Sequence, residues 1–392
     1  MKSRATSAVT ATLFILCVST VVSHAVDHQA NVKTVVDAAV QPIMEKYNIP
    51  GMAIGITIGG KPYMFDYGVA SKDTRKPITP STMFEVGSIS KTFTVTLASY
   101  AQVNGQLSLS DKTSKYLPSL EGTAFGKVEL FHLGTHTPGG FALQLPGDVK
   151  NNDQLMSYLK NWKPTYKAGT YRIYANPSIG MLGFITAKSM NQDFTALMEG
   201  RLFPALGLTS TYIDVPKNKM QDYAQGYTKK DEPVRMTTAV LSSEAYGVRT
   251  TTADLVRFME ANMNMVKLDE KLQLAVRNTH TGYFKAGAMT QDMIWEQYAY
   301  PVDLKTLLHG NSYEIMYKPT PVTQLMPPQE PRDDVLINKT GSTNGFGAYV
   351  AFVPERQLGI VILANKNYPN EDRIRIAHKI LMQLDAKSGS EN

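Results

Sequence analysis

Two side chains in the segment Ser88-Ile89-Ser90-Lys91 could do chemistry together. Residues three apart share one face of a helix, so the Ser88 hydroxyl and the Lys91 amine can touch. A serine hydroxyl is a poor nucleophile until a nearby base or cation assists it. Gly87 opens a helix whose spacing continues from Thr92 to Tyr100. At such a helix start, a free backbone N–H and the helix dipole favour negative charge, which is half of an oxyanion hole.

The Ser-x-x-Lys spacing alone is a weak signal, because Ser157-Tyr158-Leu159-Lys160 repeats it. That copy lies in a helical pattern from Gln154 to Trp162, and we interpret Ser157 as part of the polar face of an amphipathic helix. The spacing therefore needs support from other motifs before it identifies a nucleophile.

Two further motifs follow in the chain. Tyr174-Ala175-Asn176 precedes Pro177 and a helical pattern; Asn before Pro favours extended backbone, and Pro suits the first helical position. Lys339-Thr340-Gly341 ends a strand pattern, where glycine lets a ligand approach the backbone closely. Each motif also has a structural interpretation: Asn176 as a helix N-cap, Tyr174 as a buried aromatic side chain and Lys339 as a surface lysine beside a turn.

Together the three motifs resemble the serine penicillin-recognising enzymes, and Tyr-Ala-Asn as the second motif resembles class C β-lactamases. The resemblance extends over essentially the whole mature chain, through Phe84 to Ser88, Thr135 to Thr137, Gly139-Gly140 leading to Gln144, Glu244 to Val248, Asn338 to Ala351 and Leu363 to Asn370. The chain departs from that family at three places, which could alter the cephalosporins that fit: His136 where Tyr is common, Phe141-Ala142 where Leu-Pro is usual, and Ile294 where many relatives have Gly.

The resemblance implies a role for each matching residue. Ser88 attacks the lactam carbonyl, and Tyr174 lies near Lys91 and Lys339, whose charges favour the phenolate. Tyr174 then acts as general base or relays a proton to the leaving nitrogen, and whether Tyr174 or Lys91 takes the serine proton stays open. With no candidate for the separate deacylating Glu of class A, Tyr174 with a water is the expectation for deacylation.

The resemblance also implies the substrate contacts. The backbone N–H groups of Ser88 and Ser342 form the oxyanion hole, and Asn176 and Gln144 bind the side-chain amide of the substrate. The substrate carboxylate is steered by Lys339, Thr340 and Asn370, and Tyr246 forms a wall of the pocket. Asn370, which precedes Glu371-Asp372, also suits a helix N-cap, and Tyr246 also suits a packing role.

The implied function is hydrolysis of β-lactam antibiotics, chiefly cephalosporins, and thus antibiotic resistance. One alternative is a D-Ala-D-Ala carboxypeptidase or esterase of the same fold, and a more distant one is a non-catalytic β-lactam sensor. We expect no cofactor and no metal, since the His132 to His136 segment lacks the Glu of the zincin motif. A monomer is the family expectation for the oligomeric state.

The elements that position these motifs are a helix from Val32 to Tyr47, a hairpin from Met52 to Val69, and a C-terminal meander of strands between Val335 and Leu363 followed by a helix after Asn370. Helical patterns interrupted by Gly-rich and Pro-rich loops occupy the middle, and residues 213–245 suggest a long surface loop. The fold class is α/β (α+β): an antiparallel sheet flanked by helices, with an inserted helical lobe and the active site in the cleft between them. The predicted divisions are an α/β lobe of 26–102 and 213–386, a helical lobe of 103–212 and a disordered tail of 387–392.

Composition agrees with a globular protein: apolar residues make up 43% and charged residues 19% of 392. The net charge of +6 falls to +4 once the leader is removed, because the leader holds Lys2 and Arg4 and no acidic residue. The remaining charge is dispersed, with Lys229-Lys230 followed at once by Asp231-Glu232, so no basic stripe suggests nucleic acid as a partner.

The N-terminus has the features of a cleaved signal peptide, residues 1–25. Two cations precede the apolar run Ala8 to Val22, and Ser23-His24-Ala25 places small residues at the cleavage site. The alternative is a retained anchor, although the run is short for a membrane span. Cys17, the single cysteine, lies in this leader, and Leu16 before it is too large for the usual lipidation site. The mature chain is therefore expected in the periplasm, without membrane attachment, disulfides or thiol chemistry.

Overall fold

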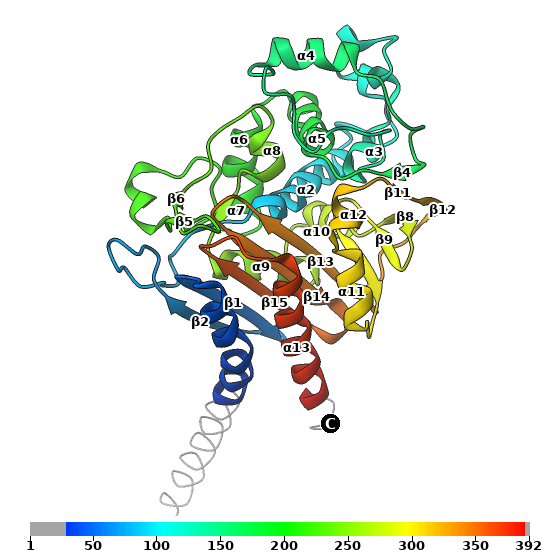
Figure 1. Ribbon diagram of the computed structural model, residues 1–392. Helices are drawn as coiled ribbons and strands as arrows, with labels where there is room; N and C mark the ends of the chain where they lie inside the picture. Colours follow the sequence, from blue (N-terminus) through cyan, green and yellow to red (C-terminus); the bar gives the residue numbers. More distant parts are fainter. Residues whose placement is uncertain (1–28, 389–392) are drawn as a thin grey trace, which may run out of the picture.

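The computed structural model describes residues 29–388, so the predicted signal peptide and Cys17 lie outside the described residues. Within that range nine strands form one antiparallel sheet in the order β12-β8-β9-β10-β13-β14-β15-β1-β2 (Figure 1). The strands are β1 (Gly51–Ile58), β2 (Lys61–Gly68), β8 (Gly282–Ala286), β9 (Met289–Gln291), β10 (Glu296–Ala299), β12 (Thr323–Gln329), β13 (Val335–Ser342), β14 (Gly347–Val353) and β15 (Leu358–Ala364).

Three two-stranded pairs lie outside this sheet: β3 (Phe84–Glu85) with β7 (Arg249–Thr250), β4 (Tyr171–Arg172) with β11 (Thr320–Pro321), and β5 (Gly226–Tyr227) with β6 (Pro233–Val234). Short 3-10 turns are η1 (Gly87–Ile89), η2 (Thr113–Lys115), η3 (Pro118–Leu120), η4 (Phe125–Lys127), η6 (Lys217–Asp222) and η7 (Pro354–Arg356), and η5 (Met198–Leu202) is a π turn.

A helix covers residues 29–47 at the start of the described range. The later helices are α2 (Ser90–Val103), α3 (Leu130–Gly134), α4 (Asn152–Asn161), α5 (Asn176–Ser189), α6 (Phe194–Leu197), α7 (Phe203–Ala205), α8 (Ser242–Tyr246), α9 (Thr252–Asn262), α10 (Glu270–Asn278), α11 (Leu304–Gly310), α12 (Tyr313–Tyr317) and α13 (Asn370–Ser388). Among residues 29–388, none of these helices is both long and apolar enough to span a bilayer.

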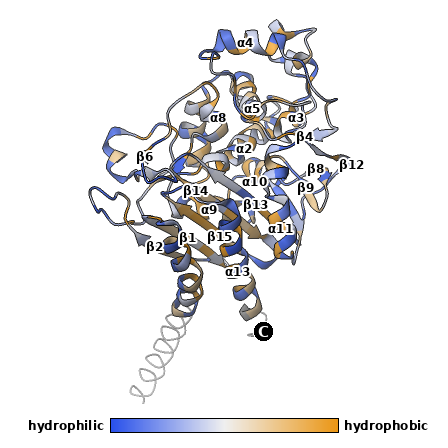
Figure 2. Cartoon of the chain, in the orientation of Figure 1, coloured by the Kyte–Doolittle hydropathy of each residue, from blue (hydrophilic) through white to orange (hydrophobic). Residues whose placement is uncertain are grey.

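The sheet is buried on both faces, as the alternation along β15 shows. Ile360 and Ile362 pack on one side with the 29–47 helix and α13, whereas Val361 and Leu363 pack on the other side with α2 and α9. Successive strand side chains point to opposite faces, so a strand covered by helices on both sides is apolar throughout. Figure 2 shows this as continuous hydrophobic colour over the central strands.

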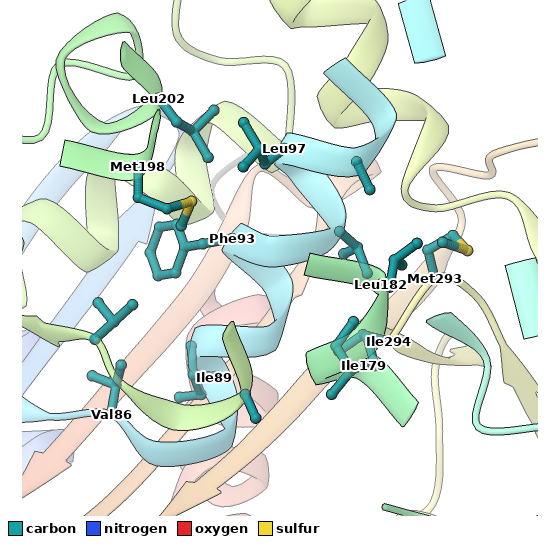
Figure 3. Close-up of a cluster of buried hydrophobic side chains, with 14 of the residues drawn as sticks. Val86, Ile89, Phe93, Leu97, Ile179, Leu182, Met198, Leu202, Met293 and Ile294 are labelled. Carbon is teal, nitrogen blue, oxygen red and sulfur yellow. The ribbon is translucent and has the colours of Figure 1, made fainter. Parts of the chain in front are cut away.

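Above one end of the sheet, α3, α4, α5, α6 and α8 gather into a mainly helical region, with α2 between it and the sheet (Figure 1). Helix α2 contacts α5, α8 and α10, and its apolar residues form the middle of a core that extends from the sheet into the helical region. Figure 3 shows Phe93 and Leu97 along this helix, facing Met198 and Leu202, and Ile89 in the turn just before it. This packing fixes the helix whose start carries Ser88.

The predicted fold class is confirmed: antiparallel sheet, flanking helices and a helical region. The predicted hairpin is β1–β2, which is in register from Gly51 opposite Gly68 to Ile58 opposite Lys61, and the predicted meander is β13–β14–β15. The 213–245 segment is mostly irregular, as expected. The lobe boundaries stay a prediction, and α13 extends two residues into the predicted tail.

Four strands of the sheet, β8, β9, β10 and β12, were not predicted. The first three are short and carry polar residues such as Thr290, Gln291 and Gln297, so they lack the apolar alternation that identifies a strand. Strand β12 contains Pro327-Pro328 and lies at the sheet edge, where proline removes no ladder hydrogen bond.

Candidate active site

Ser88 lies in the 3-10 turn η1, immediately before α2. The Lys91 ammonium, one turn on, donates to Ser88 Oγ over 2.8 Å and to the Ala245 carbonyl over 2.8 Å. Lys91 is fully buried, whereas Ser88 is partly exposed. The predicted contact between the serine and the lysine is therefore present, with only the serine open to a ligand.

The nucleophile turn packs directly against the end of β13. Gly87 has φ +50°, and a Cβ on it would lie 2.4 Å from Ser342 O. A Cβ on Gly341 would lie 2.0 Å from Val86 O, which is too close for any side chain. Glycine at 341 was interpreted as space for a ligand, but the group that approaches it here is the backbone of the nucleophile turn. These two glycines bring the backbones of Ser88 and Ser342 to the same place.

Tyr174 follows β4 and lies between the two predicted lysines. The Nζ atoms of Lys91 and Lys339 are each 5.2 Å from the centre of its ring, and Arg172 Cζ is 5.7 Å from it. Its hydroxyl is buried and has no hydrogen-bond partner among residues 29–388. Three cationic groups therefore surround the phenol ring.

Both lysines are buried. Burial lowers the pKa of Lys91 to about 8, a shift that the Tyr174 hydroxyl opposes and the charge of Lys339 increases. Burial also lowers the pKa of Lys339, although Glu296 opposes that shift and Arg172 adds to it. Lysines with a depressed pKa can take part in proton transfer near neutral pH.

A cleft of about 520 Å³ opens above these groups. Eight of the ten predicted site residues line it, namely Ser88, Gln144, Tyr174, Asn176, Tyr246, Thr340, Ser342 and Asn370. The remaining two, Lys91 and Lys339, are buried against Ser88 and Tyr174 beneath its floor. The structure thus brings together all ten residues that the sequence motifs identified.

The irregular segment before α8 forms one wall of this cleft through Val234, Arg235, Met236 and Thr237. Glu85, three residues before Ser88, holds that wall: its carboxylate accepts from the Tyr223 hydroxyl and, over 2.7 Å, from the Met236 backbone N–H. The wall and the nucleophile turn are therefore tied to each other.

The alternative interpretation of Asn176 and Asn370 as helix N-caps does not agree with the structure. The N-cap of α5 is Ala175, with φ −151°, and Asn176 is the first helical residue, with its buried Oδ1 lacking a hydrogen-bond partner in the described part of the chain. Asn370 is the first residue of α13, and its Oδ1 accepts from Arg373 Nη1 over 2.8 Å. Both amides therefore face the cleft, and neither is used to cap a helix.

Sequence reasoning missed Arg373, which is fully buried beneath this side of the cleft. Its Nη1 donates over 2.7 Å to Gly341 O and over 2.8 Å to Ser342 Oγ, besides Asn370. Arg373 therefore connects the end of β13 to the start of α13. Its signal in the sequence was a cation one turn after Asn370, on a helix face otherwise occupied by apolar residues.

An antiparallel sheet covered by helices, with a partly exposed serine lining a cleft beside a buried tyrosine and two buried lysines, defines a serine hydrolase of the penicillin-recognising type. The model of the beta-lactamase family matches residues 36–384. The chain therefore belongs to the beta-lactamase family, as a serine enzyme of class C.

Three comparisons illustrate this similarity. A beta-lactamase of Pseudomonas fluorescens is 49% identical over 355 residues, which cover 91% of this chain and 99% of that protein. The crystal structure of a class C beta-lactamase in complex with cefoxitin has a TM-score of 0.89 at 50% identity, covering 91% of this chain and 99% of that one. A D-alanine carboxypeptidase structure from Burkholderia cenocepacia has a TM-score of 0.88 at 55% identity, covering 90% and 99%.

Proposed function

We propose that the protein hydrolyses β-lactams, chiefly cephalosporins, through an acyl-enzyme on Ser88. The observation that carries this proposal is the 2.8 Å contact between Lys91 Nζ and Ser88 Oγ at the floor of the cleft. A lysine with a pKa of about 8 has a neutral fraction near neutral pH, so its amine can accept the serine proton as Oγ attacks the lactam carbonyl.

Tyr174 then carries out the next proton transfer. Its hydroxyl is buried between Lys91 and Lys339 with its lone pairs free, which suits it to pass a proton to the lactam nitrogen as the C–N bond breaks. In deacylation the same group orients a water and takes its proton, and Ser88 leaves with a proton returned from the cluster. Lys339 keeps positive charge next to the phenol throughout.

The remaining groups bind substrate. The backbone N–H groups of Ser88 and Ser342 converge because Gly87 and Gly341 allow the close approach, and we assign them the oxyanion. Asn176, whose Oδ1 is unpaired, and Gln144 lie on the same wall as Tyr246 and suit the amide side chain of the substrate. Thr340 and Asn370 also line the cleft, with the buried Lys339 next to Thr340 in β13, and they suit the substrate carboxylate.

A second candidate function is D-Ala-D-Ala carboxypeptidase activity. It is favoured by the similarity to the Burkholderia cenocepacia carboxypeptidase and to a beta-lactamase/D-alanine carboxypeptidase from Pseudomonas syringae, at 52% identity. Both reactions use the same acyl-enzyme and differ in how fast water clears it. We further propose export to the periplasm, which the leader of residues 1–25 supports.

The test is steady-state hydrolysis of a chromogenic cephalosporin by the purified mature chain, with Ser88→Ala and Ser157→Ala as a matched pair. Ser157 begins the second Ser-x-x-Lys copy and is exposed on α4, so its substitution should leave turnover unchanged. Many turnovers by the parent and none by Ser88→Ala support the proposal. One stoichiometric burst without turnover would instead identify a peptidase or a sensor.

A further inference from the structure

His136 accepts hydrogen bonds from the backbone on both sides of Tyr174. Its carbonyl oxygen accepts from the Ile173 N–H over 2.8 Å, and its Nδ1 accepts from the Ala175 N–H over 3.4 Å. Its ring lies 4.4 Å from the Tyr174 ring, at 45°. One residue therefore contacts the peptide groups before and after Tyr174 and the phenol ring itself.

These two hydrogen bonds depend on an unusual backbone conformation at His136. His136 has φ +60° and its side chain is 1% exposed. Left-handed backbone is uncommon outside glycine, although His, Asn and Asp adopt it more readily than other residues. The conformation turns the carbonyl and the imidazole of one residue toward the same neighbouring segment.

The imidazole is held as a neutral acceptor. Because Nδ1 accepts the Ala175 N–H, the ring proton belongs on Nε2. Burial holds the pKa of His136 well below its usual range, and the charges of Arg172, Lys91 and Lys339 lower it further. His136 Nδ1 is therefore available as an acceptor at neutral pH.

The Tyr174 hydroxyl has no hydrogen-bond partner of its own in residues 29–388, so the groups around its backbone and ring must fix its position. A displacement of about 1 Å in a catalytic group can lower a rate roughly a hundredfold. We propose that His136 is a positioning residue for Tyr174: by accepting the Ala175 N–H, it holds the hydroxyl between Lys91 and Lys339.

The positioning role of residue 136 depends on the imidazole of histidine. A phenyl or phenol ring at this position would have no hydrogen-bond acceptor on its γ carbon, so it could not accept the Ala175 N–H in the same way. The inference rests on the proposed role of Tyr174 in proton transfer.

Two substitutions test the hydrogen-bond acceptor and the aromatic ring of His136 separately. His136→Asn places Oδ1 on the γ carbon, where Nδ1 was, and Asn tolerates the left-handed backbone. His136→Phe keeps an aromatic ring and removes the acceptor. For a chromogenic cephalosporin, kcat of the Asn variant should stay within about threefold of the parent, whereas kcat of the Phe variant falls about tenfold or more with KM little changed.

A double substitution excludes general damage to the fold. If His136 acts through Tyr174, His136→Phe should cause no further loss of the acylation rate in a Tyr174→Phe background. Equal losses in the Asn and Phe variants, or an undiminished loss in the Tyr174→Phe background, would overturn the inference. Failure of the proposed function looks different, because the parent enzyme itself would then give a single burst.

Discussion

Arg172 and Glu296 form an ion pair of 2.7 Å whose side chains are 1% and 5% exposed. Arg172 also donates to the Ile315 carbonyl over 2.8 Å, and Glu296 is the group that opposes the fall in the pKa of Lys339. The pair therefore places one negative charge among the three cations that surround Tyr174. The carboxylate of Glu296 reduces the repulsion among these three cations, which would otherwise repel one another strongly.

Replacing Glu296 by Gln should leave Arg172 and Lys339 buried without a counter-charge. We expect the free energy of unfolding to fall by about 3–5 kcal/mol, and the pKa of Lys339 to fall further below its usual range. Denaturant unfolding measures the first effect. The control is Glu314→Gln, which removes the partner of Lys318 in a pair that is 67% and 59% exposed and should leave stability close to that of the parent. Equal effects of the two substitutions would contradict this charge balance.

Gly87→Ala should abolish turnover, because its Cβ would collide with the backbone of Ser342 and separate the two N–H groups assigned to the oxyanion. Loss of one such donor costs about 10²–10³ in kcat. Gly287→Ala is a matched control: Gly287 has φ +60° in the β8–β9 turn, but nothing lies within 4 Å of its Cβ position. That variant should lose about 1–2 kcal/mol of stability and keep its kcat. Steady-state kinetics and thermal unfolding of both variants measure these outcomes, and an active Gly87→Ala enzyme would refute the assignment.

The buried Lys91 predicts a pH dependence of stability. Its pKa is about 8 in the folded protein and 10.5 without perturbation, so between these values the unfolded chain binds more protons. Stability from this group therefore rises with pH across that window. Lys91→Met lacks this gain in stability. The free energy of unfolding of the variant minus that of the parent should therefore fall by roughly 3 kcal/mol from pH 8 to 10.5. Lys160→Met, at an exposed lysine of α4, should give a curve parallel to the parent. Parallel curves for both variants would show that Lys91 is not perturbed.

The parts of the site that could be predicted are those set by local geometry. Ser88 and Lys91 are one helical turn apart, and Lys339 to Gly341 lie at the end of a strand that its run of β-forming residues identified. The meander could be predicted because β13, β14 and β15 are joined by short turns and are apolar on both faces.

Long-range pairings could not be predicted in this way. Arg172 meets Glu296 across 124 residues, and neither residue stands in a pattern that marks it as buried. The alternative cap roles fail for a different reason: Asn is common at N-caps, but Asn176 and Asn370 each stand one position further on, as the first helical residue. The pairing of Arg172 with Glu296 and the placement of the two asparagines depend on three-dimensional packing, which the spacing of residues in the sequence does not reveal.

Ile294 is a β-branched residue in left-handed backbone, with φ +65°, and it is 1% exposed. Figure 3 shows its side chain beside Ile179, Leu182 and Met293, and its N–H donates to Gly134 O over 2.8 Å. Such a conformation costs a β-branched side chain about 1–2 kcal/mol, which glycine would not incur. The packing of the isoleucine in the core offsets this cost.

Comparing two truncations isolates the backbone cost. Ile294→Ala and Ile294→Gly both lose the buried side chain, but only glycine relieves the left-handed backbone. We therefore expect Ile294→Gly to be at least as stable as Ile294→Ala, by up to about 1 kcal/mol. At the neighbouring Ile179, inside α5, the order should reverse, with glycine about 1 kcal/mol less stable than alanine. Denaturant midpoints of the four variants decide the matter: if glycine is the less stable residue at both positions, Ile294 is not strained.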